Sequence, residues 1–358
     1  MDTPAWLCDL DVAEANLQRM QERANAAGVR LRPHTKTHKS AHFARRQVAL
    51  GATGITVAKL GEAEIMATAG IEDILLAYPL VGPLKLARLK DLLLRVPRFT
   101  CAVDSLEVAA GISEVGTALG RRVPVYLEVD STDSRRLGLQ PGEPAVAMAE
   151  RIRALPGVAL VGLMHHAGIS YSAADQAAIR DLAVREAAGL AETAKAMGGG
   201  LQVSVGSTPT ASYLDLAGRA GATEARPGTY IFNDRTEMQL GAARLEDVAL
   251  SILATVVSRP AADRVVVDAG SKTLTSDSFR GGTGFGEVWG HPDLRLARLS
   301  EEHGVMEVPA DCDLAVGDRL EIIPNHVCPC VNLTDELVGV RGGRLTSRIS
   351  VDARGRVR

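Results

Sequence analysis

The stretch RPHTKTHK concentrates basic and titratable side chains at the point where a buried strand should end. Because side chains alternate along a strand, Arg32, His34 and Lys36 share one face of it. A lysine amine withdrawn from water among other cations has a lowered pKa and can condense with an aldehyde. The alternative is a solvated loop that contains Lys36, His38 and Lys39. The spacing leaves both interpretations open, and we expect Lys39 itself to lie at the surface.

A second cluster, PNHVCPC, places His326, Cys328 and Cys330 at alternate positions, which lie on one face if the segment is extended. Imidazole and thiolate together suit zinc or another first-row metal of similar softness. Two or three protein ligands with an open position would make a Lewis-acid site. The alternative is a buried histidine beside inert thiols. A closed structural zinc site is not favoured, because no second pair of ligands appears at finger spacing.

Two further strand ends carry reactive side chains. LEVDSTDSRRLGL contains Arg135 and Arg136, and an arginine aimed into a barrel could meet an anionic substrate or a ring nitrogen. It could equally form a salt bridge with an acid at the rim. VGLMHHAGISY brings His165 and His166 to the end of another strand, and alternation allows only one of them to face the mouth.

Two later loops have the composition of phosphate-binding loops. VSVGSTPTAS offers the backbone N–H groups and hydroxyls of Gly206, Ser207 and Thr208 at a strand end. RPGTY, with Gly228 and Thr229, could supply the opposite wall. RGGTGFG has the glycine spacing of a dinucleotide-binding loop, but it does not join a strand to a helix in a βαβ unit, so we discount it.

The elements that must position these groups follow a repeating pattern. From residue 4 to about residue 235, short apolar strand-like runs alternate with helical stretches, beginning with AWLCDL and VAEANLQRMQERANAAG. Roughly eight or nine repeats predict a (β/α)₈ TIM-type barrel, in which catalytic groups project from the carboxyl ends of the strands. Strand-like segments with Gly, Pro and Asp turns follow. The sequence therefore predicts a barrel over 1–235 and a second, mostly β domain over 236–358.

Composition narrows the range of partners. The chain has 358 residues, 46% of them hydrophobic, and a formal net charge of −3, which gives no basic field for nucleic acid. We find no signal peptide and no run long enough to span a membrane, so we expect a cytoplasmic protein with a small-molecule substrate. The five cysteines form no disulfide pattern and are expected to be reduced.

Taken together, these motifs resemble those of a known family. The chain is similar to the fold-type III pyridoxal phosphate enzymes with an alanine racemase N-terminal-like barrel, in particular the metal-activated group of D-threonine aldolases and eukaryotic-type D-serine dehydratases. The resemblance covers essentially the whole chain. The motifs that carry it are TPAWLCDLD, RPHTKTHK, KLGEAE, VGPLKL, VGSTPT, RPGTYIFND, DAGSK, EEHG and PNHVCP.

The resemblance implies roles for individual residues. Lys36 would hold pyridoxal 5'-phosphate through its ε-amino group, Arg136 would face the pyridine nitrogen, and His326 with Cys328 would bind a divalent metal, zinc or manganese. A one-residue shift in the alignment leaves Arg135 as an alternative to Arg136, and the role of Cys330 stays open. The other cofactor contacts that the resemblance implies are His34, Tyr171, Ser207, Thr208, Gly228 and Thr229.

The implied chemistry is that of a lyase acting on D-3-hydroxy-α-amino acids. Bound pyridoxal phosphate spreads negative charge from the α-carbon into its ring. An arginine does not release a proton, so the ring nitrogen stays unprotonated and this electron sink is weak. A metal at the β-hydroxyl would then assist. Either Lys36 takes the α-proton for β-elimination, giving ammonia and a 2-oxo acid, or a base such as His166 starts retro-aldol cleavage to glycine and an aldehyde.

We favour β-elimination, as in D-serine and D-threo-3-hydroxyaspartate dehydratases. The His-x-Cys pair, the GSTPT loop and the HAGISY strand end match the dehydratases, whereas VGPLKL and the HVCPCVNLTDEL flank are closer to the aldolases. A racemase, which would use Lys36 and a tyrosine without metal, is less favoured. A non-enzymatic cofactor-homeostasis protein would lack the second domain. By resemblance we also expect a homodimer.

Overall fold

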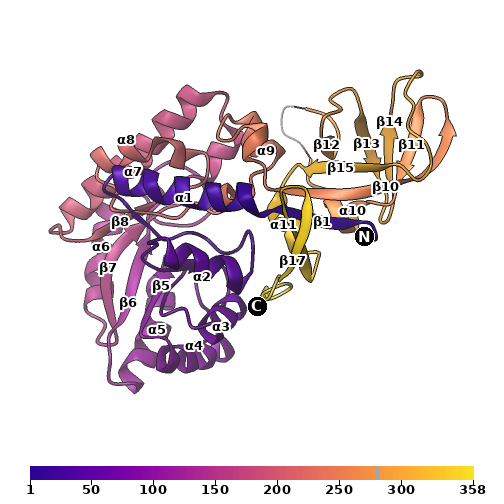
Figure 1. Cartoon of the computed structure of the whole chain (residues 1–358). Coiled ribbons are helices and arrows are strands. Elements are labelled where there is room, and N and C mark those ends of the chain that lie inside the picture. Colours follow the sequence, from indigo (N-terminus) through magenta and orange to yellow (C-terminus); the bar gives the residue numbers. More distant parts are fainter. Residues whose placement is uncertain (279–281) are drawn as a thin grey trace. The chain divides into compact units, whose positions relative to one another are not determined.

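The computed structural model describes residues 1–278 and 282–358, and the chain forms two compact units (Figure 1). Residues 280 and 281 of the RGGTGFG stretch lie outside the described residues. We call the two units the barrel unit and the β unit. The barrel unit comprises residues 19–36, 41–228 and 356–358, and the β unit comprises residues 1–18, 37–40 and 229–355.

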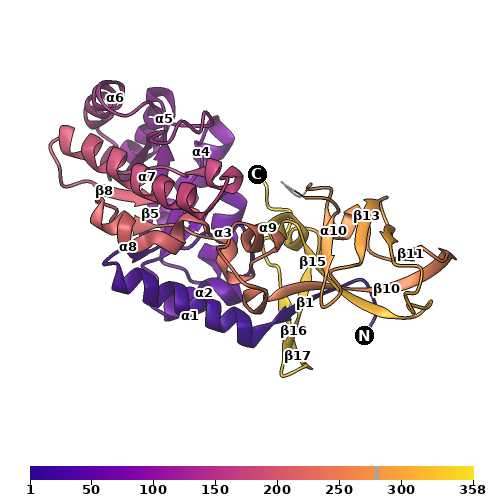
Figure 2. The same cartoon turned by 90° about the horizontal axis from the view of Figure 1, so that it is seen from above.

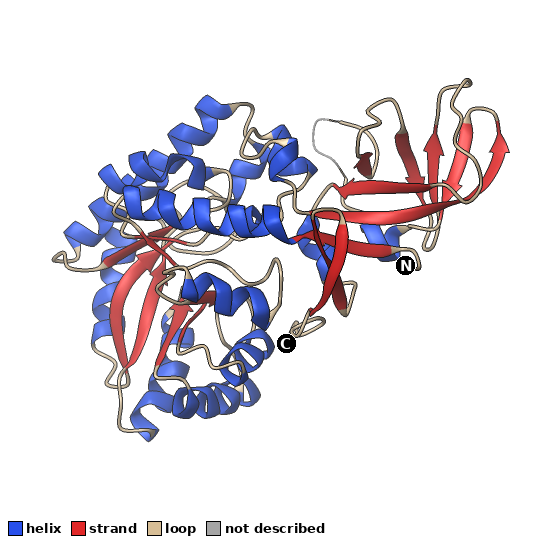
Figure 3. Ribbon diagram, in the orientation of Figure 1, coloured by secondary structure: helices blue, strands red, loops and turns tan. Residues whose placement is uncertain are grey.

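The barrel unit is built on eight parallel strands, which confirms the predicted (β/α)₈ barrel (Figure 3). The strands pair in the order β2-β9-β8-β7-β6-β5-β4-β3. A parallel bridge between His34 and Thr56 joins the two outer strands of this order. The strands are β2 (Arg30–Leu31), β3 (Ile55–Val57), β4 (Asp73–Leu76), β5 (Arg98–Val103), β6 (Val123–Glu128), β7 (Val158–Met164), β8 (Gln202–Val205) and β9 (Glu224–Ala225).

Helices that follow the strands bury their apolar faces against the outside of the barrel. Local sequence fixes where they begin: the Asp175 carboxylate accepts a hydrogen bond from the backbone N–H of Ala178 at the start of α7. These helices are α2 (Ala41–Ala49), α3 (Leu60–Thr68), α4 (Pro83–Arg95), α5 (Leu106–Ala118), α6 (Glu143–Arg153), α7 (Gln176–Ala196) and α8 (Leu214–Arg219), with 3₁₀ turns η1 (Gly168–Ser172) and η2 (Thr210–Tyr213). The first helix of the chain, α1 (Leu10–Ala26), has residues 10–18 in the β unit and the rest in the barrel unit.

Glycine is required where α5 meets the loop before β7. A Cβ atom added at Gly157 would lie 1.9 Å from the Ser113 carbonyl oxygen, so no larger residue fits unless the backbone moves. The interior of the barrel is partly polar: the buried Arg32 guanidinium donates to Glu224 over 2.8 Å and also to Asp73. These ion pairs satisfy charges that would otherwise be costly to bury.

The β unit contains a nine-stranded sheet with the main order β13-β14-β11-β10-β1-β16-β17, and β15 pairs with β10 and β12. Besides the first half of α1, its remaining elements among the described residues are three short helices and two 3₁₀ turns. The strands are β1 (Ala5–Asp9), β10 (Leu250–Ala261), β11 (Arg264–Val267), β12 (Gly286–Val288), β13 (Arg295–Leu299), β14 (Gly304–Glu307), β15 (Arg319–Pro324), β16 (Glu336–Arg341) and β17 (Arg344–Ser350). The helices and turns are α9 (Arg235–Gln239), α10 (Ser271–Leu274), α11 (Val327–Val331), η3 (Thr229–Ile231) and η4 (Leu245–Asp247).

The expectation that AWLCDL opens the barrel as part of a βα unit is wrong. This segment forms β1, which pairs antiparallel with β10 and parallel with β16 inside the β unit (Figure 2). An apolar strand-like run shows that a strand will be buried, but it does not tell which sheet the strand joins. Among the described residues, no helix combines the length and apolar character that crossing a bilayer requires.

Candidate functional site

The RPHTKTHK stretch is a bridge followed by a turn, and it is not a solvated loop. His34 carries the bridge to β3, and residues 35–38 form the turn. His38 is fully buried and Lys39 is only 6% exposed, so the expectation that Lys39 lies at the surface is wrong. Lys39 adopts a positive φ of 49°, and its carbonyl accepts a hydrogen bond from the backbone N–H of Ala353 over 2.9 Å. The partner of this hydrogen bond is remote in the sequence, so the polar residues around Lys39 could not indicate that it is buried.

Lys36 is half-buried at this turn, and His34 supports it. The Nδ1 atom of His34 accepts a hydrogen bond from the backbone N–H of Lys36 over 3.3 Å. The backbone N–H of His34 donates to the carbonyl of Pro227 over 2.9 Å. His34 therefore fixes the backbone on which the Lys36 side chain is carried and connects it to the residues that precede Gly228.

Of the two histidines after β7, His166 has the surroundings of a proton acceptor. Burial lowers its pKa well below 6.5, and the positive charges of Lys36, Arg136 and Arg226 lower it further. Its Nδ1 atom lies 3.1 Å from the carbonyl oxygen of Gly206. Because a carbonyl only accepts, Nδ1 carries the proton and Nε2 of the neutral ring can accept one.

His165 faces a different set of partners. Its Nε2 atom lies 2.8 Å from the Thr132 hydroxyl and 3.4 Å from the Asp130 carboxylate. Burial, aided by the charges of Arg226 and Arg136, lowers its pKa to about 4 despite the Asp130 charge. The two adjacent rings therefore have different hydrogen-bond partners, and the charge of Lys36 contributes to the lowered pKa of His166.

The two adjacent arginines also separate. The backbone N–H of Arg135 donates to the Asp130 carboxylate over 2.8 Å, and its guanidinium forms an exposed pair with Asp133 at 3.2 Å. Arg136, in contrast, is one of the charges that lower the pKa of His166 after burial and Lys36. Arg135 therefore forms the salt bridge expected at the rim, whereas the charge of Arg136 acts on His166.

A compact group of hydroxyls follows β8. The Ser207 hydroxyl lies 2.9 Å from that of Ser170 and 3.0 Å from that of Thr210. Ser207 and Thr208 are almost fully buried, and Gly206 before them has a φ of +113°, a conformation that favours glycine. Backbone N–H groups and hydroxyls gathered in this way can bind an anion such as a phosphate.

Of the remaining predicted cofactor contacts, Tyr171 adjoins this group in the chain, and Gly228 and Thr229 lie where the barrel-unit segment ends. Tyr171 follows Ser170 in η1, and its ring centroid lies 6.3 Å from that of His166. Gly228 is the last residue of the long barrel-unit segment, and Thr229 begins the β-unit segment after it. Within the β unit, the Thr229 hydroxyl lies 3.7 Å from the Cys328 sulfur.

Glu186 is a residue that the motif search missed. It lies on α7, is fully buried, and its Oε1 atom accepts hydrogen bonds from the backbone N–H groups of Ala167 (3.0 Å) and Gly206 (3.2 Å). Oε2 has no hydrogen-bond partner, and burial raises the pKa of this carboxyl to about 7. Glu186 therefore joins the segments that follow β7 and β8. The sequence feature that could have identified Glu186 is a glutamate on the otherwise apolar face of a helix.

The His326 and Cys328 region is helical, and the expectation of an extended segment is wrong. Residues Val327–Val331 form α11, and His326 directly precedes it. Cys330 is buried, and its thiol donates to the carbonyl of Leu274 over 3.3 Å, so it belongs to the core of the β unit. A proline in the first turn of a helix is tolerated, so Pro329 did not exclude a helix here.

His326 is surrounded by acidic groups. Its Nδ1 atom lies 2.8 Å from Oδ2 of Asp277. The His326 side chain is 46% exposed and that of Asp277 49%. Partial desolvation would lower the pKa of His326, but the charge of Cys328, a side-chain hydrogen bond to Cys328 and the acidic groups of Asp234 and Asp277 raise it to about 10. The Cys328 sulfur also lies 3.2 Å from the Thr37 hydroxyl. Of the three side chains that PNHVCPC singled out, His326 and Cys328 are therefore direct neighbours.

Two buried carboxyls of this region were not predicted as site residues: Asp234, the last residue of RPGTYIFND, and Glu237, which lies in none of the motifs. Asp234 accepts hydrogen bonds from the backbone N–H groups of Glu237 (3.0 Å) and Val327 (2.9 Å). Glu237 is fully buried, and neither of its carboxylate oxygens has a hydrogen-bond partner. Burial and the charges of Asp234 and Cys328 raise its pKa. Among the described residues, no group of three or more His, Cys, Asp or Glu side chains has metal-binding geometry.

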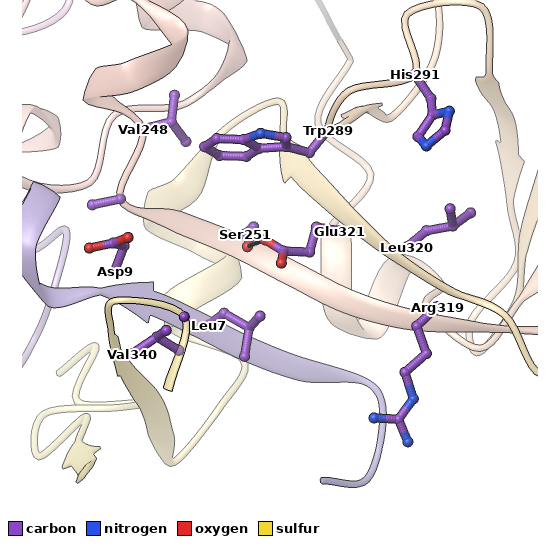
Figure 4. Close-up of a pocket in the computed structure, with 12 residues that line it drawn as sticks. Leu7, Asp9, Val248, Ser251, Trp289, His291, Arg319, Leu320, Glu321 and Val340 are labelled. Carbon is purple, nitrogen blue, oxygen red and sulfur yellow. Dashed lines mark hydrogen bonds between the residues drawn. The ribbon is translucent and has the colours of Figure 1, made fainter. Parts of the chain in front are cut away.

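A cavity of about 370 Å³ lies elsewhere in the β unit (Figure 4). Trp289 lies on one side of it and Leu7 and Val340 on the other. The Ser251 hydroxyl in its lining donates to Glu321 over 2.7 Å. None of the predicted site residues lines this cavity.

Comparison with known proteins identifies the family. Residues 8–236 match the model of the alanine racemase N-terminal domain, and residues 249–340 match the model described as "Putative serine dehydratase domain". The chain belongs to the alanine racemase N-terminal domain family. This alanine racemase-like chain is thus a fold-type III pyridoxal phosphate enzyme, and the resemblance seen in its motifs is confirmed.

Relatives of this alanine racemase-like chain align over nearly its whole length. It is 40% identical to D-threo-3-hydroxyaspartate dehydratase of Delftia sp. (strain HT23), over 92% of the chain and 91% of the relative. It is 35% identical to D-threonine aldolase of Arthrobacter sp., over 99% and 93%. The crystal structure of D-threonine aldolase from Filomicrobium marinum matches with a TM-score of 0.90 and 33% identity, over 100% and 96%.

Proposed function

We propose that the protein is a pyridoxal phosphate- and divalent-metal-dependent lyase that acts on D-3-hydroxy-α-amino acids, with β-elimination as its main reaction. The relatives whose names are dehydratase and aldolase of such substrates support the substrate class. The observation that carries the proposal is the hydrogen-bonded pair of His326 and Cys328 in a chain that also holds Lys36 beside a neutral His166.

The barrel unit has groups that fit pyridoxal phosphate. When bound, this cofactor supplies an electron sink for charge that develops at the α-carbon. Lys36 would hold it covalently, and Arg136 would face its ring nitrogen. The buried hydroxyls of Ser207 and Thr208 suit its phosphate. The turn before them needs a glycine, because a Cβ added at Gly206 would lie 3.3 Å from the Arg226 backbone nitrogen. The further residues that would contact the cofactor are His34, Tyr171, Ser207, Thr208, Gly228 and Thr229.

The β unit has a donor pair that fits a divalent metal. The His326 imidazole and the Cys328 sulfur are close enough to interact, so a cation could be shared by these two donor atoms. Imidazole and thiolate donors favour zinc, and manganese is the alternative. A metal with an open position supplies a Lewis acid that stabilises charge on a substrate oxygen.

Chain connectivity supports a common role for the two sets of residues. Thr37, which follows Lys36 by one peptide bond, lies 3.2 Å from the Cys328 sulfur within the β unit. Thr229, which follows Gly228 by one peptide bond, lies 3.7 Å from the same sulfur. Both predicted cofactor segments therefore continue directly into contacts of the predicted metal pair.

The residues of the chain distinguish two reactions. In elimination, the Lys36 amine takes the α-proton and the hydroxyl leaves from the β-carbon, giving a 2-oxo acid and ammonia. In retro-aldol cleavage, a base takes the hydroxyl proton and the bond between the α- and β-carbons breaks, giving glycine and an aldehyde. The neutral ring of His166, with Nε2 able to accept a proton, favours cleavage as the second candidate.

Product analysis tests the proposal. The purified enzyme is incubated with D-serine, D-threonine or D-threo-3-hydroxyaspartate and with zinc or manganese, and 2-oxo acid and glycine are quantified in the same sample. We expect 2-oxo acid as the main product. The L isomers should not react, and enzyme whose metal has been removed by a chelator should show no activity. Glycine as the main product would make cleavage the function. If the enzyme interconverts the D and L isomers in the absence of metal, its function is that of a racemase and not of a lyase.

We further propose that the enzyme is a cytoplasmic homodimer without nucleic acid or membrane partners. The net charge of −3 supports the lack of a nucleic-acid partner. Light scattering of the purified holoenzyme tests the oligomeric state, with the mass of two chains expected. A mass of one chain over the whole concentration range would contradict it.

A further inference from the structure

The hydrogen bond between His326 and Asp277 determines which ring nitrogen is available. The Nδ1 atom of His326 lies 2.8 Å from Oδ2 of Asp277. A carboxylate only accepts, so Nδ1 carries a proton and donates it. The side-chain hydrogen bond to Cys328 then belongs to the other nitrogen, Nε2. The ring is held between an aspartate on one side and a thiol sulfur on the other.

Asp277 is itself held by the residue that precedes the histidine. The side-chain amide of the buried Asn325 donates to the Asp277 carbonyl and to the Gly284 carbonyl, each over 3.0 Å. Arg235 donates to the Asn325 side-chain oxygen over 3.2 Å. These contacts fix the backbone of Asp277 relative to His326, although the two residues are 49 positions apart in the sequence.

The other acidic groups near the His326 ring, Asp234 and Glu237, make no side-chain hydrogen bond to it that is seen among the described residues. Both oxygens of Asp234 accept backbone N–H groups, those of Glu237 and Val327. Neither oxygen of Glu237 makes a hydrogen bond, so it does not hold the ring. Among the described residues, Asp277 is the acid for which a side-chain hydrogen bond to the His326 ring is seen.

We propose that Asp277 is a positioning residue for the metal site. It fixes the tautomer and the orientation of the His326 ring, so that Nε2 and the Cys328 sulfur together face a divalent cation. This inference rests on the metal dependence in the proposed function. Carboxylates that orient a ligating histidine raise metal affinity by about 10- to 100-fold, and Asp277 has the geometry of such a partner.

Metal affinity of the metal-free protein is the direct test. Zinc binding to wild type, Asp277→Ala and Asp277→Asn is measured by competition with a chromophoric chelator. The control is Asp335→Asn, since Asp335 is an exposed acid of the same unit that pairs with Arg354 at 3.3 Å. We expect the dissociation constant to rise about 10- to 100-fold for Asp277→Ala and less for Asp277→Asn, which keeps an acceptor oxygen. The control should match wild type.

Three further readouts separate positioning from loss of structure. The thermal unfolding midpoint of the metal-free Asp277→Ala protein should match that of wild type. The thiolate-to-cobalt absorption of the Co²⁺ forms should change, because the imidazole orientation changes while Cys328 remains. Turnover of Asp277→Ala should return towards the wild-type value at saturating zinc.

The two levels of the proposal fail in different ways. If wild type binds zinc and Asp277→Ala binds it equally well, the positioning role is overturned and the proposed function stands. If wild type turns over its substrate and binds neither zinc nor manganese, the metal dependence falls and the role of Asp277 falls with it.

Discussion

His166 and His326 are the same residue type in opposite electrostatic surroundings. Burial and the charges of Lys36, Arg136 and Arg226 lower the pKa of His166 well below 6.5. The charge of Cys328 and the acids around the half-exposed His326 outweigh its partial desolvation and raise its pKa to about 10. The barrel unit thus provides a positive environment that suits an anionic cofactor, and the β unit provides a negative one that suits a cation.

The largest expected effect comes from removing the cation nearest to the chemistry. Lys36→Ala should abolish turnover, with a loss of about 10³-fold or more, because both the covalent link to the cofactor and the base for the α-proton disappear. The visible absorption of the bound cofactor should shift to that of the free aldehyde, and metal affinity should stay within a few-fold of wild type. Wild-type turnover by this variant would contradict the assignment.

His326→Gln breaks the negative side of the comparison. We expect metal affinity and turnover to fall by about 100-fold or more, because a ligand is lost and not only its orientation. The covalently bound cofactor, measured by absorption and by borohydride sensitivity, should remain, since this residue belongs to the β unit. Loss of cofactor together with metal would show that the two environments are not independent.

Arg136→Ala and Arg135→Ala form a matched pair. Arg136→Ala should lower turnover by roughly tenfold, the cost expected for loss of one hydrogen bond to a charged group. For retro-aldol cleavage, in which His166 would be the base, it should also move the acidic limb of the pH–rate profile to higher pH, because the Arg136 charge lowers the pKa of His166. Arg135→Ala removes an exposed ion pair with Asp133 and should leave both unchanged. The reverse result would exchange the roles of the two arginines.

Glu186→Gln should change turnover least and should change the pH dependence of stability. Burial raises the pKa of Glu186 from 4.5 to about 7, so between these values the folded protein binds more protons than the unfolded chain. Wild-type stability therefore falls as pH rises from about 4.5 to 7. Glutamine does not titrate, so the variant should gain about 2 to 3 kcal/mol relative to wild type across this window, measured by urea unfolding. If the free energy of unfolding of wild type and of Glu186→Gln changed with pH in the same way, the raised pKa of Glu186 would be refuted.

Local patterns in the sequence predicted the barrel and the residues that lie in short motifs. The alternation of strands and helices determined the fold, and RPHTKTHK and PNHVCPC singled out Lys36, His326 and Cys328. The spacing left Arg135 and Arg136 equivalent. Only the turn organised by Asp130, which binds the backbone N–H of Arg135, separates them.

Contacts between remote segments were beyond the reach of these patterns. β1 joins the β unit because it pairs with β10 and β16, and periodicity does not specify a partner. Lys39 is buried by a tie to Ala353 near the other end of the chain. Asp277 and Glu186 act through the fold alone, since neither lies near its partners in sequence.

The covalent attachment of the cofactor tests the central assignment most directly. The purified holoenzyme is reduced with borohydride and digested with a protease, and the peptide that carries the phosphopyridoxyl group is sequenced by mass spectrometry. We predict that the modified residue is Lys36, with Lys39 in the same peptide unmodified. Modification of a different lysine, or a fully active enzyme without any modified lysine, would contradict the account.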